Sequence, residues 1–166
     1  MIKPEFSRPI AVEQIGRAAR DVTVEADAAE CAALARRMGL PAVESLRCAF
    51  ALRRATDAAG VIAAEGRLMA RVVQVCVVTL DEFTADVAET FAIRFVPAGT
   101  ESAEIDLDGP DEVPYEAGRV DLGEAAAEQL ALALDPFPRL PGVAMPEEDD
   151  AAAGRPFASL GKLRRH

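Results

Sequence analysis

Apolar and polar residues alternate along three consecutive segments of the chain, residues 43–55, 61–80 and 85–97. A period of two is typical of a β-strand with one buried side, because successive side chains point to opposite faces of the sheet. Short links join the segments, so we predict an antiparallel meander. The length of the second segment predicts a bend or bulge at Gly66. The predicted inward positions are Leu46, Cys48, Phe50 and Leu52, then Leu68, Ala70 and Val72, and then Val87, Phe91, Ile93 and Phe95.

A helical period replaces the alternation in "DAAECAALARRMGLP", residues 27–41. Asp27 is the expected N-cap, and Glu30 completes a capping box three residues later. Gly39 and Pro41 end this helix, because glycine favours a left-handed C-cap and proline cannot continue a helix. The expected apolar stripe consists of Cys31, Leu34, Ala35 and Met38.

A second helix is predicted in "VDLGEAAAEQLALALDPFPRLPG", residues 120–142. Asp121 and Glu124 have the spacing of another capping box, which explains both acids without catalysis. Its apolar stripe consists of Ala126, Leu130, Ala133 and Leu134, and the helix ends before Pro136, Pro138 and Pro141.

Residues 98–119 have no sustained periodicity, which predicts a long acidic loop with a short strand near Glu104–Leu107. The fold class is therefore α+β: an antiparallel β-sheet meander with a few packed helices and a long acidic loop. We expect a single domain over residues 1–166. Within it we expect 143–155 to be a mobile acidic segment, and 156–166 to be a C-terminal tail docked through its apolar residues, Phe157, Leu160 and Leu163.

The negative charge of the chain is concentrated in one block. The net charge is −10, yet residues 101–150 carry two Lys/Arg against 15 Asp/Glu, and residues 151–166 carry four against none. One interpretation is a solvated stretch that keeps the protein soluble. The other is a surface that binds a basic protein partner and repels nucleic acid phosphates. The candidate partner-binding residues are Glu101, Glu104, Asp106, Asp108, Asp111 and Glu112.

Composition predicts a cytoplasmic protein. The chain has no run of about 18 apolar residues, so no membrane span is expected. Its start, "MIKPEFSRPI", lacks the apolar stretch of a signal peptide. Three scattered cysteines do not predict a disulfide framework, which favours a reducing compartment.

The residues that usually carry chemistry form no clear constellation, so we do not expect an enzyme or a cofactor. Cys31 and Cys48 lie at apolar positions and are more simply explained as buried hydrophobes than as metal ligands. His166 ends the chain and is poorly placed as an oriented base. A Gly-rich phosphate loop is missing. The alternative is a Mg²⁺-dependent hydrolase or nuclease, since such a site needs only one or two carboxylates.

Arginines recur on the polar side of the predicted meander. Solvation of the outer sheet face explains them most simply, and contact with RNA is the alternative, although no aromatic residue lies among them to stack bases. Arg94 is expected on the same face. The candidate RNA contacts are Arg47, Arg53, Arg67 and Arg71, with Lys162, Arg164 and Arg165 in the tail.

Three stretches resemble motifs of one family. "GRLMARVVQVCVVTLDEF" (66–83) is similar to a G-x-L-x-A strand leading into C-x-x-C-L. Residues 120–142 are similar to D-L-x-E followed by E-x-L-x-L-x-L-x-P-x-P, and "RPFASLGKL" (155–163) is similar to a P-F-A-x-L-x-x-L ending. Their order over residues 10–163 resembles the YceD family, the large ribosomal RNA subunit accumulation proteins.

The resemblance implies a small cytoplasmic protein that acts in the synthesis, processing or stability of large-subunit (23S) ribosomal RNA. The implied partner is a ribosomal protein or a pre-ribosomal large-subunit particle, and an acidic block suits a basic partner. Many family members have cysteines in the C-x-x-C and after the P-x-P. Here Thr79 replaces the second cysteine and "RLPG" (139–142) replaces the later ones, so we expect no metal.

Overall fold

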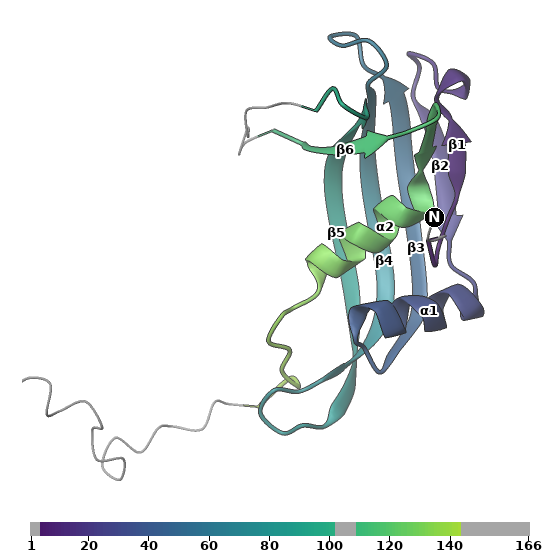
Figure 1. Cartoon of the computed structure of the whole chain (residues 1–166). Helices are drawn as coiled ribbons and strands as arrows, with labels where there is room; N and C mark the ends of the chain where they lie inside the picture. Colours follow the sequence, from purple (N-terminus) through teal and green to yellow (C-terminus); the bar gives the residue numbers. More distant parts are fainter. Residues whose placement is uncertain (1–3, 102–108, 144–166) are drawn as a thin grey trace, which may run out of the picture.

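The computed structural model describes residues 4–101 and 109–143. Within these ranges a five-stranded sheet has the order β2-β3-β4-β5-β6, and β1 pairs with β7 in a separate two-stranded sheet (Figure 1). All pairings are antiparallel except that of β5 with β6. The elements are β1 (Pro9–Ala11), η1 (Val12–Gln14), β2 (Arg20–Glu25), α1 (Ala28–Met38), β3 (Ala42–Arg54), β4 (Ile62–Val75), β5 (Glu82–Pro97), β6 (Asp111–Tyr115), β7 (Arg119–Asp121) and α2 (Leu122–Ala133).

The predicted meander is confirmed as β3, β4 and β5, and the α+β class is confirmed with it. Inward residues alternate with exposed ones along β3 and β4, and Cys48 is fully buried. The expected irregularity lies elsewhere: the register shifts between Val43 and Ser45, whereas Gly66 pairs regularly with Phe50 and Phe91.

Gly66 does not form a bulge; its lack of a side chain leaves room for an aromatic ring. A Cβ built at this position would lie 2.1 Å from Cζ of Phe91. The ring of Phe91 therefore crosses β4 at Gly66 and meets the ring of Phe50 edge to face, with 5.8 Å between centroids. Such aromatic pairs contribute about 0.5–1.5 kcal/mol beyond the area that they bury.

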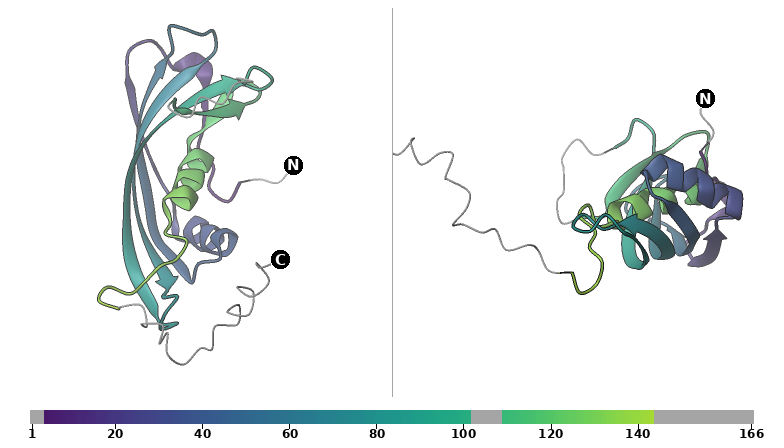
Figure 2. Two further views of the ribbon diagram at one scale, coloured as in Figure 1. Left: turned by 90° about the vertical axis from the view of Figure 1, so that its left-hand side faces the viewer. Right: turned by 90° about the horizontal axis from the view of Figure 1, so that it is seen from below.

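Both helices cover the concave face of the curved sheet (Figure 2). The side chain of Asp27 and that of Glu30 form the predicted capping box of α1, and Gly39 ends the helix with φ of 66°. Leu34 from α1 and Leu130 from α2 are fully buried. The convex face of the sheet has no helix on it within the described residues (Figure 2).

The start of α2 holds the N-terminal segment. Asp121 caps α2, and its Oδ1 also accepts a hydrogen bond from the backbone N–H of Arg8 at 2.7 Å. The predicted capping box is wrong in its second half, because Glu124 binds the guanidinium of Arg37 at 2.7 Å instead. A Cβ at Gly123 would lie 2.6 Å from the carbonyl oxygen of Phe6, so glycine permits this close approach.

Part of the predicted acidic loop is sheet. Residues 111–115 form β6 and residues 119–121 form β7, so the assignment of 98–119 to one loop is wrong. The strand expected near Glu104–Leu107 lies outside the described residues, as does the tail 156–166 and all of the segment 143–155 except Val143. In the described ranges, neither helix has the length and apolar character needed to cross a membrane.

Candidate functional site

The convex face of the sheet carries the arginines that the sequence singled out. Arg47 and Arg53 project from β3, Arg67 and Arg71 project from β4, and all four are exposed. Arg94 on β5 lies in the same cross-strand row as Arg53, because both pair with Ala63. The alternation therefore placed these residues on the correct face, and their contact with RNA stays a prediction.

Acidic side chains pair with three of the five arginines. These side chains are partly or largely exposed, so each pair contributes little to stability. The ion pair with Arg94 lowers the pKa of Asp57 from its ordinary value. The nitrogen–oxygen distances are 3.5 Å for Arg53–Glu65, 3.0 Å for Arg71–Glu44, 3.5 Å for Arg71–Asp86 and 3.0 Å for Arg94–Asp57.

Arg47 and Arg67 differ from the other three, since neither has an ion pair within the described part of the chain. Arg47 lies opposite Met69 and is therefore diagonal to both Arg67 and Arg71 on β4. Diagonal Cα atoms in an antiparallel pair are about 7–8 Å apart, so the charges of Arg47 and Arg67 lie close together here, beside that of Arg71, which Glu44 and Asp86 offset. An anionic group bound at this point would reduce their mutual repulsion.

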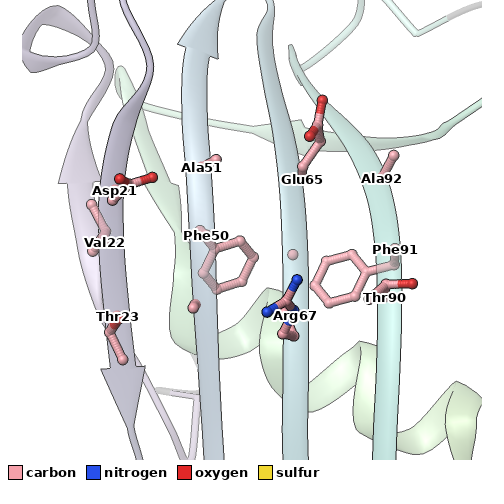
Figure 3. Close-up of a pocket in the computed structure, with 12 residues that line it drawn as sticks. Asp21, Val22, Thr23, Phe50, Ala51, Glu65, Arg67, Thr90, Phe91 and Ala92 are labelled. Atoms are coloured by element: carbon pink, nitrogen blue, oxygen red, sulfur yellow. The ribbon is translucent and has the colours of Figure 1, made fainter.

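A shallow hollow of about 630 Å³ lies beside Arg67 (Figure 3). Its floor is low because small side chains occupy the neighbouring outward positions, Ala49 and Ala51 on β3 and Ala92 on β5. Figure 3 shows Glu65 and Arg67 on β4 between Ala51 on one side and Thr90 on the other. The polar lining residues are Asp21, Thr23, Glu65, Arg67 and Thr90.

The chemistry of this hollow is that of binding. Arg67, Thr23 and Thr90 can donate hydrogen bonds to a ligand, and the carboxylates of Asp21 and Glu65 can accept them. The lining includes no histidine, cysteine or other nucleophile–base pair. The contribution of β2 was not predicted from the sequence, although "RDVTVE" (20–25) alternates in the manner of a strand.

The predicted acidic site is described in part. Glu101 is exposed after β5, and Asp111 and Glu112 are exposed on β6. Glu112 pairs with Arg94 in the strand register and so adjoins the arginine-bearing face, whereas Asp111 pairs with Ile93, which faces the core. The remaining three candidates, Glu104, Asp106 and Asp108, lie outside the described residues, as do Lys162, Arg164 and Arg165.

The hairpin after β4 brings together the positions of the family cysteines. The backbone N–H of Val77 donates to the carbonyl of Pro138 at 2.9 Å, which places segment 138–140 against the hairpin. Hydrogen bonds from the backbone of Leu140 and from Thr79 lower the pKa of the Cys76 thiol to about 7. Cys76, Thr79 and Leu140 supply one thiol, whereas a zinc site usually has three or four nitrogen, sulfur or carboxylate ligands.

A family model described as "Large ribosomal RNA subunit accumulation protein YceD" matches residues 64–164. The match covers more than half of the 166 residues. The chain belongs to the YceD family. The resemblance inferred from motifs is confirmed, although it was extended to residue 10 and the YceD match begins at residue 64, inside β4. No curated protein and no solved structure matches the chain.

The YceD match covers β4 from residue 64 and everything after it up to residue 164. It therefore includes Arg67 and Arg71 but not Arg47 or Arg53. It also includes the acidic block, the hairpin of Cys76 and the segment that follows α2. The family name connects the chain with the accumulation of large-subunit ribosomal RNA.

Proposed function

We propose that this YceD protein acts in the biogenesis of the large ribosomal subunit as a binding factor that catalyses no reaction. Membership of the YceD family is the observation that carries the proposal. The hollow beside Arg67 supports a binding role, because it has the donors and acceptors of a binding surface.

The partner in this proposal is a basic ribosomal protein or a pre-ribosomal large-subunit particle. Exposed carboxylates on β6 and at Glu101 flank residues 102–108, which add three more acids. β6 is short and contains Pro114, which has no N–H to donate to another strand. A partner would therefore meet this edge mainly through charge, which favours fast association with a basic protein.

Affinity purification from native lysate tests the proposal. We expect the wild-type chain to recover large-subunit precursors or one ribosomal protein, identified by RNA sequencing and mass spectrometry. Recovery should fall at least fivefold when the six candidate acids of residues 101–112 are changed to Asn or Gln. A matched variant should retain recovery: it neutralises six other acids, Glu13, Glu25, Asp81, Glu82, Glu147 and Asp149. Equal recovery by all three chains would reject the acidic site, and no ribosomal material would reject the function.

Direct contact with ribosomal RNA is a second candidate, favoured by the absence of ion pairs at Arg47 and Arg67 in the described structure. Each phosphate that an arginine no longer neutralises should reduce the salt dependence of RNA binding by about one unit of slope. An Arg47→Gln/Arg67→Gln variant should therefore bind RNA more weakly and with a smaller slope than an Arg53→Gln/Arg71→Gln variant of the same charge. Equal effects of the two variants would indicate bulk electrostatics and no site.

A titration distinguishes a Mg²⁺-dependent hydrolase or nuclease from the two binding functions. If the protein is a binding factor without a magnesium site, adding Mg²⁺ should cause weak chemical-shift changes spread over many carboxylates in NMR spectra. Saturable shifts confined to a few carboxylates would instead support a magnesium site.

A further inference from the structure

The lower part of β5 is a sheet edge with no partner strand among the described residues. β5 pairs with β4 along its length, but β6 covers only Ile93–Pro97. Within the described residues, no strand pairs with the other edge of residues 82–92. Proteins usually cover or blunt so long an edge, because its free N–H and C=O groups attract other strands.

A groove runs along this edge. One hollow of about 350 Å³ lies between β5 and the segment after α2, and another of about 320 Å³ lies between β5 and α2. Both are lined by Glu89 and Ala133, so the two hollows adjoin each other along this edge. Phe83, Val87 and Phe91 line the groove and are only half-buried, while Leu132 on α2 is 72% exposed.

The charge of the groove is negative. Glu89 and Asp135 are among its lining residues, as is Asp86, which also pairs with Arg71, and Arg139 is its one basic lining residue in the described part of the chain. The groove therefore fits a segment that combines apolar side chains with positive charge.

We propose that the groove between β5 and α2 binds residues 155–163 of this same chain. The sequence "RPFASLGKL" has Phe157, Leu160 and Leu163 at intervals of three residues, and 151–166 carry four Lys/Arg and no acid. The apolar side chains cover Phe83, Val87 and Leu132, and the basic ones face Glu89 and Asp135. The docked segment also covers the unpaired edge of β5.

The path of the chain supports this occupant. Pro138 and Arg139 line the groove, and the segment after α2 runs beside the lower part of β5 (Figure 1). Residues 144–154 then precede the proposed occupant, and eleven extended residues reach at most about 36–40 Å. The unpaired edge is itself about 33–36 Å long at the usual rise per residue. The YceD match includes both the groove-lining elements and residues 155–163.

Docking has a consequence for RNA binding. Lys162 cannot neutralise the groove carboxylates and a phosphate group at the same time. The docked tail therefore cannot also use Lys162 to bind RNA, whichever partner the acidic block has.

The lysine content of the chain makes the test specific, since Lys3 and Lys162 are its only lysines. Carbodiimide joins a lysine amine to a carboxylate in direct contact, and mass spectrometry of the full chain locates the bond. We expect Lys162 to be joined mainly to Glu89, Asp86 or Asp135 within one chain. Leu132→Ser should reduce this product at least threefold, as should the tail variant Leu160→Asp. Leu80→Ser is the matched control, because Leu80 is 76% exposed and does not line the groove.

Three results would overturn the proposal. The first is a Lys162 product spread over exposed acids such as Glu13 and Glu25 as strongly as over the groove. The second is an equal yield in the Leu132→Ser and Leu80→Ser variants. The third is a product found only between two chains, which would make a second copy the occupant. None of these results depends on whether the protein acts in ribosome biogenesis.

Discussion

Gly66 leaves the space in the middle of β4 that the ring of Phe91 occupies. Gly66→Ala should therefore destabilise the protein by about 1–3 kcal/mol, the usual cost of overpacking a core. The free energy of unfolding in urea measures this loss. Gly16→Ala is the control, because a Cβ at Gly16 meets nothing within 4 Å. Gly66→Ala/Phe91→Leu should recover part of the loss, and a failure to recover it would mean that the ring is not the cause.

The lowered pKa of the Cys76 thiol predicts that the stability of the protein depends on pH. Its pKa is lowered from 9.0 to about 7 in the folded chain, so folding favours the thiolate. The resulting stabilisation is fully present above pH 9 and is lost as the pH falls through about 7. The difference in free energy of unfolding between the wild type and Cys76→Ala should therefore grow as the pH rises over this range.

Cys48 is the internal comparison for this experiment. Burial raises the pKa of its thiol to about 12, so its contribution is present below pH 9 and is lost as the pH rises toward 12. The pH dependence of Cys48→Ala should thus have the opposite sign. The same sign for both variants would show that the hydrogen bonds from Leu140 and Thr79 do not stabilise the Cys76 thiolate.

At the scale of elements, Asp121 joins α2 to the N-terminal segment. Besides capping α2, it accepts hydrogen bonds from the backbone of Arg8 and from the hydroxyl of Ser7. Losing a cap costs about 1 kcal/mol, and an unpaired N–H adds to this, so Asp121→Ala should cost about 2 kcal/mol or more. Chemical denaturation should show a change within about 0.5 kcal/mol for the exposed Asp111→Ala. A smaller cost at Asp121 than at the ordinary cap Asp27 would contradict its second role.

The hairpin of Cys76 and segment 138–140 carry a prediction about metal. One thiol beside Thr79 and Leu140 is too few ligands for a tetrahedral zinc site. Elemental analysis of the purified protein should find well below one zinc ion per chain. Thr79→Cys/Leu140→Cys supplies three thiols at one place and should bind zinc at least tenfold more tightly. One tightly bound zinc in the wild type would refute the prediction.

At the scale of the whole molecule, the acidic block should act through its charge rather than through the fold. Neutralising Glu101, Glu104, Asp106, Asp108, Asp111 and Glu112 should leave the melting temperature within a few degrees, because the described members are exposed. Association with a basic partner should become slower than that of the wild type. This difference in association rate should shrink as the salt concentration rises, because the screening length is already about 8 Å at physiological ionic strength and shortens further. Surface plasmon resonance at several salt concentrations measures this. A chain that melts much earlier would place these acids in the structure.

Local patterns in the sequence determined the centre of the fold. Alternation with a period of two predicted which residues of β3, β4 and β5 face the core, since a strand exposes alternate side chains whatever its partner. The cap residues Asp27 and Asp121 marked both helix starts, because a cap interacts with its own first turn. The same local rules placed Arg47 and Arg67 on the outer face. They also assigned the YceD motifs to a strand, a helix and a tail.

Contacts between distant residues decided the rest. β6 pairs in parallel with β5, and β1 pairs with β7. Each pairing depends on a second segment of the chain, so the short segment by itself contains no pattern that predicts it. Gly66 was predicted as a bend because the ring that needs its space lies on another strand. Likewise, Glu44, Asp57, Glu65 and Asp86 became partners of particular arginines only through strand register and the loop at Asp57, which left Arg47 and Arg67 without ion pairs among the described residues. The sequence shows which side chain each position carries, but only the folded structure determines which charged group or aromatic ring contacts that side chain.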